Sequence, residues 1–278
     1  MVITQIIILF ISIFNNHVSA RDCTVDILRP DSYFFNYFYY YYDDIPTRLI
    51  VPKENIHITS IKEGDKTIWN AGRGPKCFML TIRLASDRPI LLHISTLSQE
   101  SSGYNLYKVA GEWRFDLIDT KEKATKALFE QRHIPKNRRI FTLDFFITKE
   151  DDQFAVMRFD IFKIPVRFHV PKLAHHATEV VYRRSSLWKA TKKDEHCITV
   201  ASHLKNLEPI LICVVISDYN EITVLYFEKK DYFWRKLDPA NFETRLKEAF
   251  DHVCRYAMEE SRGLGDKLGG VEEMMDTS

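Results

Sequence analysis

Two pairs of adjacent residues, His175-His176 and His196-Cys197, carry side chains of the kinds that bind zinc in proteins. A zinc site also needs a spacing such as CxxC or HxxxH, which brings two ligands to one ion, and the sequence contains neither. Adjacent residues of a strand point to opposite faces, so each pair offers only one ligand to a given site. We therefore predict structural or surface roles for these residues and neither a metal nor a cofactor.

Motifs for catalysis are missing as well. The sequence has no Gly-x-Ser-x-Gly elbow for a nucleophile and no cysteine in a recognisable protease context. Residues 71–76 lack the spacing of a phosphate-binding loop, and we expect an ordinary loop there. Asp26 and Asp144 follow the openings of two strands, where we expect them to bind backbone or turn groups rather than to transfer protons. The sequence thus predicts a protein without enzymatic activity.

The five cysteines are too few for a disulfide framework in a chain of 278 residues. Cys77 and Cys197 occupy equivalent strands of the repeat described below, where a buried thiol is the ordinary finding. A bridge between Cys197 and Cys213 across neighbouring strands is an alternative that the sequence leaves open.

Nine of the ten residues from Tyr33 to Tyr42 are aromatic, and only Asn36 interrupts them. One interpretation is a contact surface for a sugar, a lipid or a protein. The other is a long strand with one face in the core, which the comparable stretch around residues 154–162 favours because it has fewer aromatics. The surplus tyrosines remain the candidates for partner binding, namely Tyr37, Tyr39, Tyr40, Tyr41 and Tyr42.

An internal repeat indicates which elements must position these residues. Residues 45–71 align without a gap with residues 164–190, and ten of the 27 positions are identical. The register continues on both sides with slips of one or two residues, as expected where loops tolerate insertions. The repeat framework consists of Asp26, Pro52, Trp69 and Trp113 in the first copy and of Asp144, Pro171, Trp188 and Trp234 in the second.

Each copy contains short β-branched or aromatic runs with brief connections, which predict strands. In the second copy they are Cys197–Leu204, Pro209–Ser217, Glu221–Phe227 and Tyr232–Leu237. Residues 217–220 have the composition of a hairpin turn. Since the connections leave no room for crossover helices, we expect antiparallel pairing.

One helix is expected at the end of each copy. Asp238 is a good N-cap before Pro239, and apolar residues then recur at helical spacing from Phe242 to Ala257. Residues 119–122 resemble a capping box in the first copy. The predicted fold is mainly β or α+β, with two tandem antiparallel β-rich domains, each closed by a C-terminal α-helix. We assign residues 21–132 to domain 1, 133–139 to a linker, 140–258 to domain 2 and 259–278 to a flexible tail.

Residues 1–20 have the pattern of a signal peptide. An apolar run from Ile6 to Phe14 precedes Val18, Ser19 and Ala20, which place small residues before a cleavage site between Ala20 and Arg21. No later segment reaches membrane-spanning length. We expect a secreted protein without a transmembrane segment after cleavage.

The order of these features resembles that of the FAINT-domain proteins, "frequently associated in Theileria", a large set in Theileria and related parasites. Matching features, besides the leader, are Val25-Asp26-Ile27, Ile68-Trp69, Pro89–Leu92 and Tyr107 with Trp113, and in the second copy Leu143-Asp144-Phe145, Leu187-Trp188, Pro209–Ile212 and Tyr226 with Trp234. The resemblance implies a secreted parasite protein, often delivered to the host cell cytoplasm, and it implies no enzymatic activity. The chain lacks the Pro/Gln-rich or DNA-binding regions of nuclear family members.

The charge of the chain agrees with a partner other than nucleic acid, because 39 Lys and Arg nearly balance 38 Asp and Glu. We predict a secreted non-enzymatic protein, a parasite effector or host-interaction binding module whose partner is a host or parasite protein. The alternatives are a small-ligand receptor or enzyme with a pocket between the two domains, and a structural component of the parasite surface.

Overall fold

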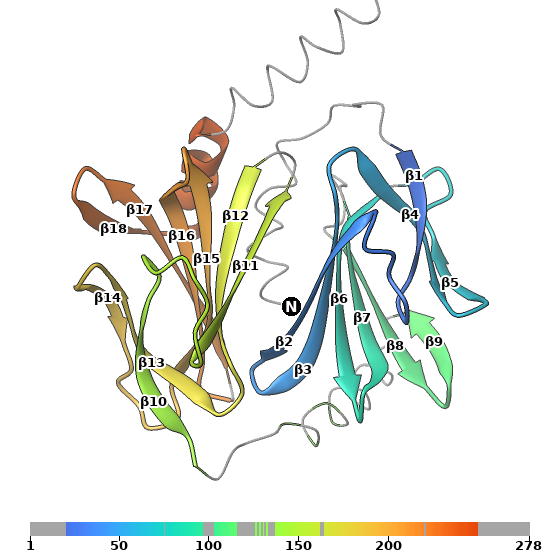
Figure 1. Ribbon diagram of the computed structural model, residues 1–278, viewed down its shortest axis with the longest axis horizontal. Coiled ribbons are helices and arrows are strands. Elements are labelled where there is room, and N and C mark those ends of the chain that lie inside the picture. The colour runs from blue at the N-terminus through green and yellow to red at the C-terminus, as the bar shows by residue number, and fades with distance from the viewer. Residues whose placement is uncertain are drawn as a thin grey trace, which may run out of the picture.

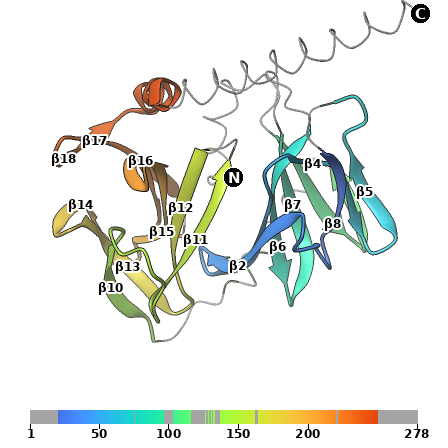
Figure 2. The ribbon, with the colours of Figure 1, turned by 45° about the horizontal axis from the view of Figure 1, so that its top comes forward.

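The computed structural model describes residues 21–74, 76–96, 103–115, 126, 128, 130, 132, 137–161, 164–219 and 221–249. These residues form two nine-stranded sheets that lie side by side (Figure 1, Figure 2). The first sheet consists of β1 (Arg21–Asp26), β2 (Phe35–Tyr42), β3 (Ile45–Pro52), β4 (Ile56–Glu63), β5 (Lys66–Asn70), β6 (Cys77–Ala85), β7 (Arg88–Thr96), β8 (Gly103–Val109) and β9 (Glu112–Phe115). The second sheet consists of β10 (Arg139–Asp144), β11 (Phe154–Ile161), β12 (Ile164–Pro171), β13 (His175–Tyr182), β14 (Ser185–Lys189), β15 (His196–Lys205), β16 (Glu208–Ser217), β17 (Ile222–Lys230) and β18 (Phe233–Leu237). The prediction of a mainly β fold is confirmed.

Both sheets have the same strand order. The first runs β1-β4-β6-β7-β8-β9, with β3 also paired to β6, β2 to β3 and β5 to β4. The second runs β10-β13-β15-β16-β17-β18, with β12, β11 and β14 in the corresponding places. Register shifts recur as well, between Cys23 and Thr24 in the first sheet and between Phe141 and Thr142 in the second. The repeated sequence therefore folds twice into one topology.

One strand pair in each sheet is parallel, so the expectation of purely antiparallel domains was wrong. β1 pairs in parallel with β4, and β10 pairs in parallel with β13. A parallel pair needs a crossover connection, which is usually a helix, and the connections in this sequence have no room for one. Here the β2–β3 hairpin makes the crossover from β1 to β4 and itself joins the sheet through β6, so no helix is required.

Each sheet bends around an apolar cluster of its own. Val25 of β1 and Leu106 of β8 stand far apart in the strand order, yet they share one buried cluster, which requires the first sheet to curve. Leu143 of β10 and Phe227 of β17 share a cluster in the second sheet in the same way. These clusters bury one face of the strands, and β6 and β16 are buried along most of their length because their other face is covered as well.

A helix of residues 239–249 follows β18, as the sequence predicts. Asp238 caps it, because its Oδ1 accepts a hydrogen bond from the backbone N–H of Asn241 at 2.9 Å and its carbonyl accepts one from Phe242 at 3.0 Å. Phe242 and Leu246 are fully buried against the second sheet. In the first copy, residues 126, 128 and 130 are helical, and the rest of the helix expected there lies outside the described residues.

Several other predicted segments also lie outside the described residues, namely residues 1–20, including Ala20, and the tail at residues 259–278. Arg21 is the first described residue and opens β1. Arg139, which we assigned to the end of the linker, is the first residue of β10. Among the residues described, no helix combines the length and the apolar composition needed to cross a membrane.

Asp26 and Asp144, which are equivalent in the repeat, make equivalent hydrogen bonds in the two sheets. Oδ1 of Asp26 accepts hydrogen bonds from the backbone N–H groups of Leu28 and Gly64, at 3.0 and 3.2 Å. Oδ1 of Asp144 accepts them from Phe146 and Arg183, at 3.1 and 3.2 Å. Each carboxylate ties the end of the sheet's first strand to a hairpin turn that is distant in sequence.

Replacing Asp144 tests this tie. Asp144→Ala removes a charged acceptor from two backbone donors, and we expect the free energy of unfolding in urea to fall by about 1.5–3 kcal/mol. Asp144→Asn retains an acceptor oxygen and should keep most of that free energy. Equal stability of the alanine variant and the wild type would contradict the role.

Candidate functional site

The aromatic run forms strand β2, and its alternate residues have different surroundings. Tyr40 and Tyr42 are 4% and 1% exposed, and Phe38 packs against the same buried cluster. Tyr37 and Tyr39 point to the other face and are 42% and 45% exposed. The structure therefore separates the five candidate tyrosines into a buried pair and an outward row.

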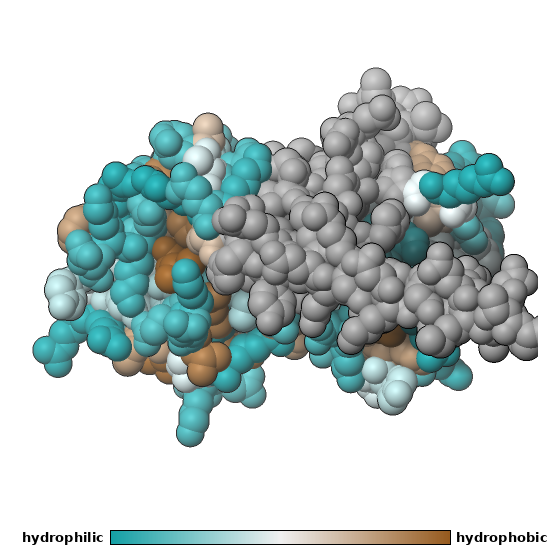
Figure 3. Space-filling view, turned by 90° about the horizontal axis from the view of Figure 1, so that it is seen from above, coloured by the Kyte–Doolittle hydropathy of each residue, from teal (hydrophilic) through white to brown (hydrophobic). Residues whose placement is uncertain are grey.

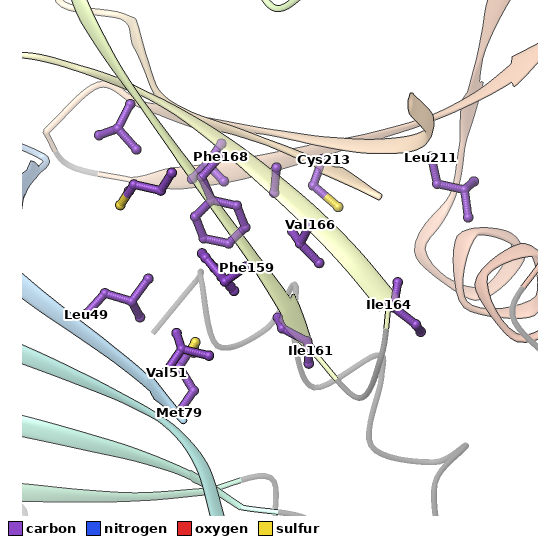
Figure 4. Close-up of a cluster of buried hydrophobic side chains, with 14 of the residues drawn as sticks. Leu49, Val51, Met79, Phe159, Ile161, Ile164, Val166, Phe168, Leu211 and Cys213 are labelled. Atoms are coloured by element: carbon purple, nitrogen blue, oxygen red, sulfur yellow. The ribbon is translucent and has the colours of Figure 1, made fainter. Parts of the chain in front are cut away.

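The buried pair belongs to an apolar cluster that both sheets build, which we call the inter-sheet cluster (Figure 4). Its members from the first sheet are Tyr40, Tyr42, Leu49, Val51, Phe78 and Met79, and those from the second sheet include Met157, Phe159, Ile161, Phe168, Val170 and Ile198. The rings of Phe38 and Phe159 lie 5.5 Å apart across the boundary. Tyr40 and Tyr42 thus make contacts within the chain.

Equivalent strands face each other across this boundary. The repeat aligns Tyr40 with Phe159, Tyr42 with Ile161 and Leu49 with Phe168, and all six side chains are members of the inter-sheet cluster. Equivalent residues of the two copies therefore meet in one apolar cluster. The repeat shows which residues are equivalent but carries no signal that the equivalent residues contact each other.

The outward row consists of Tyr37, Tyr39 and Tyr41. Tyr41 is half-buried, and its ring lies 6.0 Å from that of Tyr39 in an edge-to-face arrangement. Among the described strands, β2 pairs with β3 alone, so its other edge carries no strand of the described chain. The row thus lies on a strand with one edge that is unpaired among the described residues, although β2 also approaches β11 and β12 of the second sheet.

A tight turn joins β2 to β3 and brings two carboxylates to the second sheet. Asp43 and Asp44 have φ angles of 53° and 60°, the left-handed conformation that a two-residue hairpin turn requires and that aspartate tolerates. Both are buried, with exposures of 4% and 8%. Buried carboxylates need charged or hydrogen-bonding partners, and the second copy supplies most of them.

Five side chains surround the two carboxylates, and the fifth is Ser217, beside Asp43. Asp43 forms an ion pair with Arg132, and one of its oxygens lies 3.5 Å from Nε2 of His196. Asp44 accepts a hydrogen bond of 2.7 Å from the Tyr219 hydroxyl and lies 3.5 Å from Nε2 of His176. Arg132 also donates to the Tyr219 carbonyl, at 3.1 Å. We call this set the aspartate–histidine junction.

The two histidine rings stack at 4.5 Å with an angle of 25° between their planes. They come from β13 and β15, one from each of the two pairs that the sequence singled out. The prediction that each pair offers one side chain to a given place agrees with this. Their convergence was not predicted, since it requires β13 and β15 to be neighbours, with Ala177 opposite Cys197.

The junction favours charged aspartates. Burial acts to raise the pKa of Asp43, but hydrogen bonds from His196 and Ser217 and the charge of Arg132 outweigh it and lower the pKa from its ordinary value of 3.8. Burial has the same effect on Asp44, and hydrogen bonds from His176 and Tyr219 lower its pKa in turn. The pKa of Tyr219 is raised, first by burial and then by its bond to Asp44. The contacts that lower the pKa of each aspartate therefore come mainly from the second copy and from Arg132.

The remaining predicted residues lie within the two frameworks. Trp69 is buried in the cluster of the first sheet, and Trp113 packs against it while its Nε1 donates to Glu63 at 3.0 Å. Trp188 and Trp234 pack against the cluster of the second sheet. Pro52 and Pro171 end β3 and β12.

Cys77, Cys197 and Cys213 are buried free thiols. The bridge left open between Cys197 and Cys213 does not form, because the register places Cys213 opposite Ala201 and Cys197 opposite Ile216. Burial raises the pKa of each of these thiols, which makes them poor nucleophiles.

Comparison with family models finds one match. Residues 24–108, from β1 into β8, match the FAINT model, a domain of unknown function (DUF529). Searches of curated proteins and of solved structures found no match.

The equivalence of Tyr40 and Phe159 leads to a test. The Tyr40 hydroxyl is buried and has no hydrogen-bond partner among the described residues, so Tyr40→Phe should leave the free energy of unfolding unchanged or raise it by up to about 1 kcal/mol. Tyr40→Ala should lower it by about 3–5 kcal/mol through the cavity that it leaves. Tyr39→Phe, on the outward row, serves as the control and should have little effect. Clear destabilisation by Tyr40→Phe would show that the hydroxyl has a partner.

Acid should weaken the junction. Because the folded state lowers the pKa of Asp43 and Asp44, their contribution is fully present above about pH 3.8, the ordinary value, and is lost as the pH falls through the lower folded values. We expect the double variant Asp43→Asn/Asp44→Asn to be less stable than the wild type at pH 7, by about 3–5 kcal/mol. The difference should narrow below pH 3.8 in urea unfolding at each pH. Asp65→Asn, at an exposed turn, is the control, and a pH-independent difference for the double variant would contradict the prediction.

Proposed function

Starting from a chain whose residues 24–108 form a FAINT domain, we propose that this protein is a secreted, non-enzymatic binding protein that recognises a partner protein through the outward row of β2. The observation that carries the proposal is the exposure of Tyr37 and Tyr39 on a strand with one edge that is unpaired among the described residues. In the second copy the equivalent residues are Val156 and Arg158. The tyrosines are therefore not part of the shared framework.

A free strand edge and a row of tyrosines suit the binding of an extended peptide segment. Backbone groups of the edge bind an added strand, and side chains two residues apart lie on one face and select what binds. Tyrosine supplies a large contact area at a low entropic cost and is common in protein recognition. Arg48 of β3 is paired with Tyr39 across the two strands, and it adds a positive charge beside the row.

We propose that the second unit, residues 140–258, is a divergent copy of the same domain. We also propose that a helix closes the first unit, as one closes the second. The shared strand order and the shared bulges support this reading. The inter-sheet cluster and the aspartate–histidine junction then serve to hold the two units in one arrangement.

The junction brings together two aspartates and two histidines, as an enzyme between the domains would require. Their side chains, however, are only 3–8% exposed and are bonded to one another. This arrangement favours a structural role for the junction. We therefore rank a small-ligand receptor or enzyme with a pocket between the domains second, after the binding protein. A third is a structural component of the parasite surface.

The leader at residues 1–20 and the resemblance to secreted Theileria proteins support export from a parasite. In our proposal the protein reaches the host cell, where it acts as an effector on a host protein. The near balance of acidic and basic residues supports a protein partner over nucleic acid.

The proposal is tested with the double variant Tyr37→Ser/Tyr39→Ser. Partners captured from host lysate by the mature wild-type protein are identified, and their affinity is then measured with purified proteins. We expect the double variant to bind at least about tenfold more weakly, with an unchanged unfolding transition. Phe115→Ser, which removes an aromatic side chain that is 56% exposed in the first sheet and lies outside the row, should bind as the wild type does. Retention of every partner by the folded double variant would overturn the proposal.

A further inference from the structure

Three hairpin turns at one end of the second sheet carry basic and large apolar residues. Arg183 and Arg184 form the β13–β14 turn, Leu207 lies in the β15–β16 turn, and Tyr232 and Phe233 lie at the β17–β18 turn. Leu207 is 82% exposed, Tyr232 102% and Phe233 55%. The β14 and β17–β18 hairpins lie on the side of the second sheet away from the first, and we call this set the basic–aromatic end (Figure 1, Figure 2).

Contacts between the turns make one continuous surface. Glu208, at the start of β16, accepts hydrogen bonds from the Tyr182 hydroxyl and from Lys229, both at 3.1 Å. Arg183 stacks over the ring of Phe146, 4.1 Å from its centroid. Phe146 is itself 41% exposed and adds a further apolar group to this end. Seen from above, hydrophobic residues in brown interrupt the hydrophilic surface on the side of the second sheet (Figure 3).

The first sheet provides an internal comparison, because its three equivalent strand pairs are also joined by two-residue turns. They contain Gly64-Asp65, Ser86-Asp87 and Ala110-Gly111, with no large apolar residue. The four residues of each turn carry Lys66 and Arg88 against Glu63, Asp65, Asp87 and Glu112, a net charge of −2. In the second sheet the same positions carry Arg183, Arg184, Lys205 and Lys230 against Glu208 and Asp231, a net charge of +2. The fold does not require the basic–aromatic end.

Leu207 is an unfavourable residue for the stability of its turn. Its φ angle is 66°, in the left-handed region that favours glycine and asparagine, and its side chain is exposed to water. The backbone is therefore strained and the apolar side chain buries little in the folded protein. Strained residues of this kind occur where function requires the side chain.

Apolar side chains at convex hairpin tips, surrounded by cations, match the surface of an anionic bilayer. Tyrosine and phenylalanine partition into the region of the lipid headgroups, and leucine into the acyl boundary. Each lysine or arginine near the anionic surface strengthens binding by about fivefold. A concave protein partner would not need several separate protruding tips with cations around them.

We propose that the basic–aromatic end of the second sheet docks the protein on anionic membrane surfaces, with Leu207, Tyr232 and Phe233 inserted among the lipids and the cations on the phosphates. This surface is separate from the outward row of β2. One of the two contacts can therefore be lost while the other remains.

The test measures co-sedimentation of the mature chain with vesicles of phosphatidylcholine and phosphatidylserine at a ratio of about 3:1. Binding to these vesicles and not to pure phosphatidylcholine is expected, with a loss at high salt. Tyr232→Ser/Phe233→Ser should weaken binding by at least about tenfold. Arg184→Glu/Lys230→Glu should weaken it by more than about twentyfold, since two cations are reversed.

Leu207→Asn distinguishes docking from a structural role. Asparagine suits the φ angle of this turn, so the variant should be as stable as the wild type or more stable while it binds vesicles more weakly. Phe115→Ser is the matched control, because Phe115 of the first sheet is exposed to the same degree as Phe233. No binding to anionic vesicles, binding only to an added single-stranded oligonucleotide, or equal losses in the Phe115→Ser control would each overturn the proposal.

Discussion

The structure depends on the burial of one apolar face that the two sheets share. Each sheet has an inner cluster of its own, but the opposite face of β2, β3 and β6 is also apolar and would otherwise be in water. Six side chains of the first sheet enter the inter-sheet cluster. Full burial of an apolar side chain of this kind stabilises the folded state by about 1.5–3 kcal/mol. The sum is on the order of 10 kcal/mol, and the covalent link between the two units reduces the entropic cost of their association.

The free energy gained at the inter-sheet cluster offsets the cost of burying the carboxylates of Asp43 and Asp44 beside it. Removing Asp43 and Asp44 from water costs several kcal/mol, and their partners return much of that only when the geometry is good. An apolar face alone, however, would tolerate sliding of one sheet over the other. The paired carboxylates, the stacked histidines and Arg132 match in a single arrangement, so the junction selects the register that the inter-sheet cluster stabilises.

The sequence predicted elements whose signals are local or repeated. Short β-branched or aromatic runs predicted the strands of the second copy to within a few residues, and Asp238-Pro239 predicted the start of the helix. The repeat indicated that one topology would occur twice. Long-range consequences could not be predicted: the parallel pairing of β1 with β4, the approach of His176 to His196, and the burial of Tyr40 beside an exposed Tyr39 all depend on which strands become neighbours.

Duplication also explains where the two copies differ. Positions that both copies need for the inner clusters and for the shared face remain apolar in both, although the residue type changes, as from Tyr40 to Phe159. Positions outside these constraints have diverged, and they have done so differently in each unit. The first copy has tyrosines on the open edge of β2, and the second has cations and aromatics at its turns. The inter-sheet cluster and the junction hold the two copies together. The outward row of β2 and the basic–aromatic end therefore keep a fixed distance and orientation, which suits the proposed binding of a partner protein and a membrane at the same time.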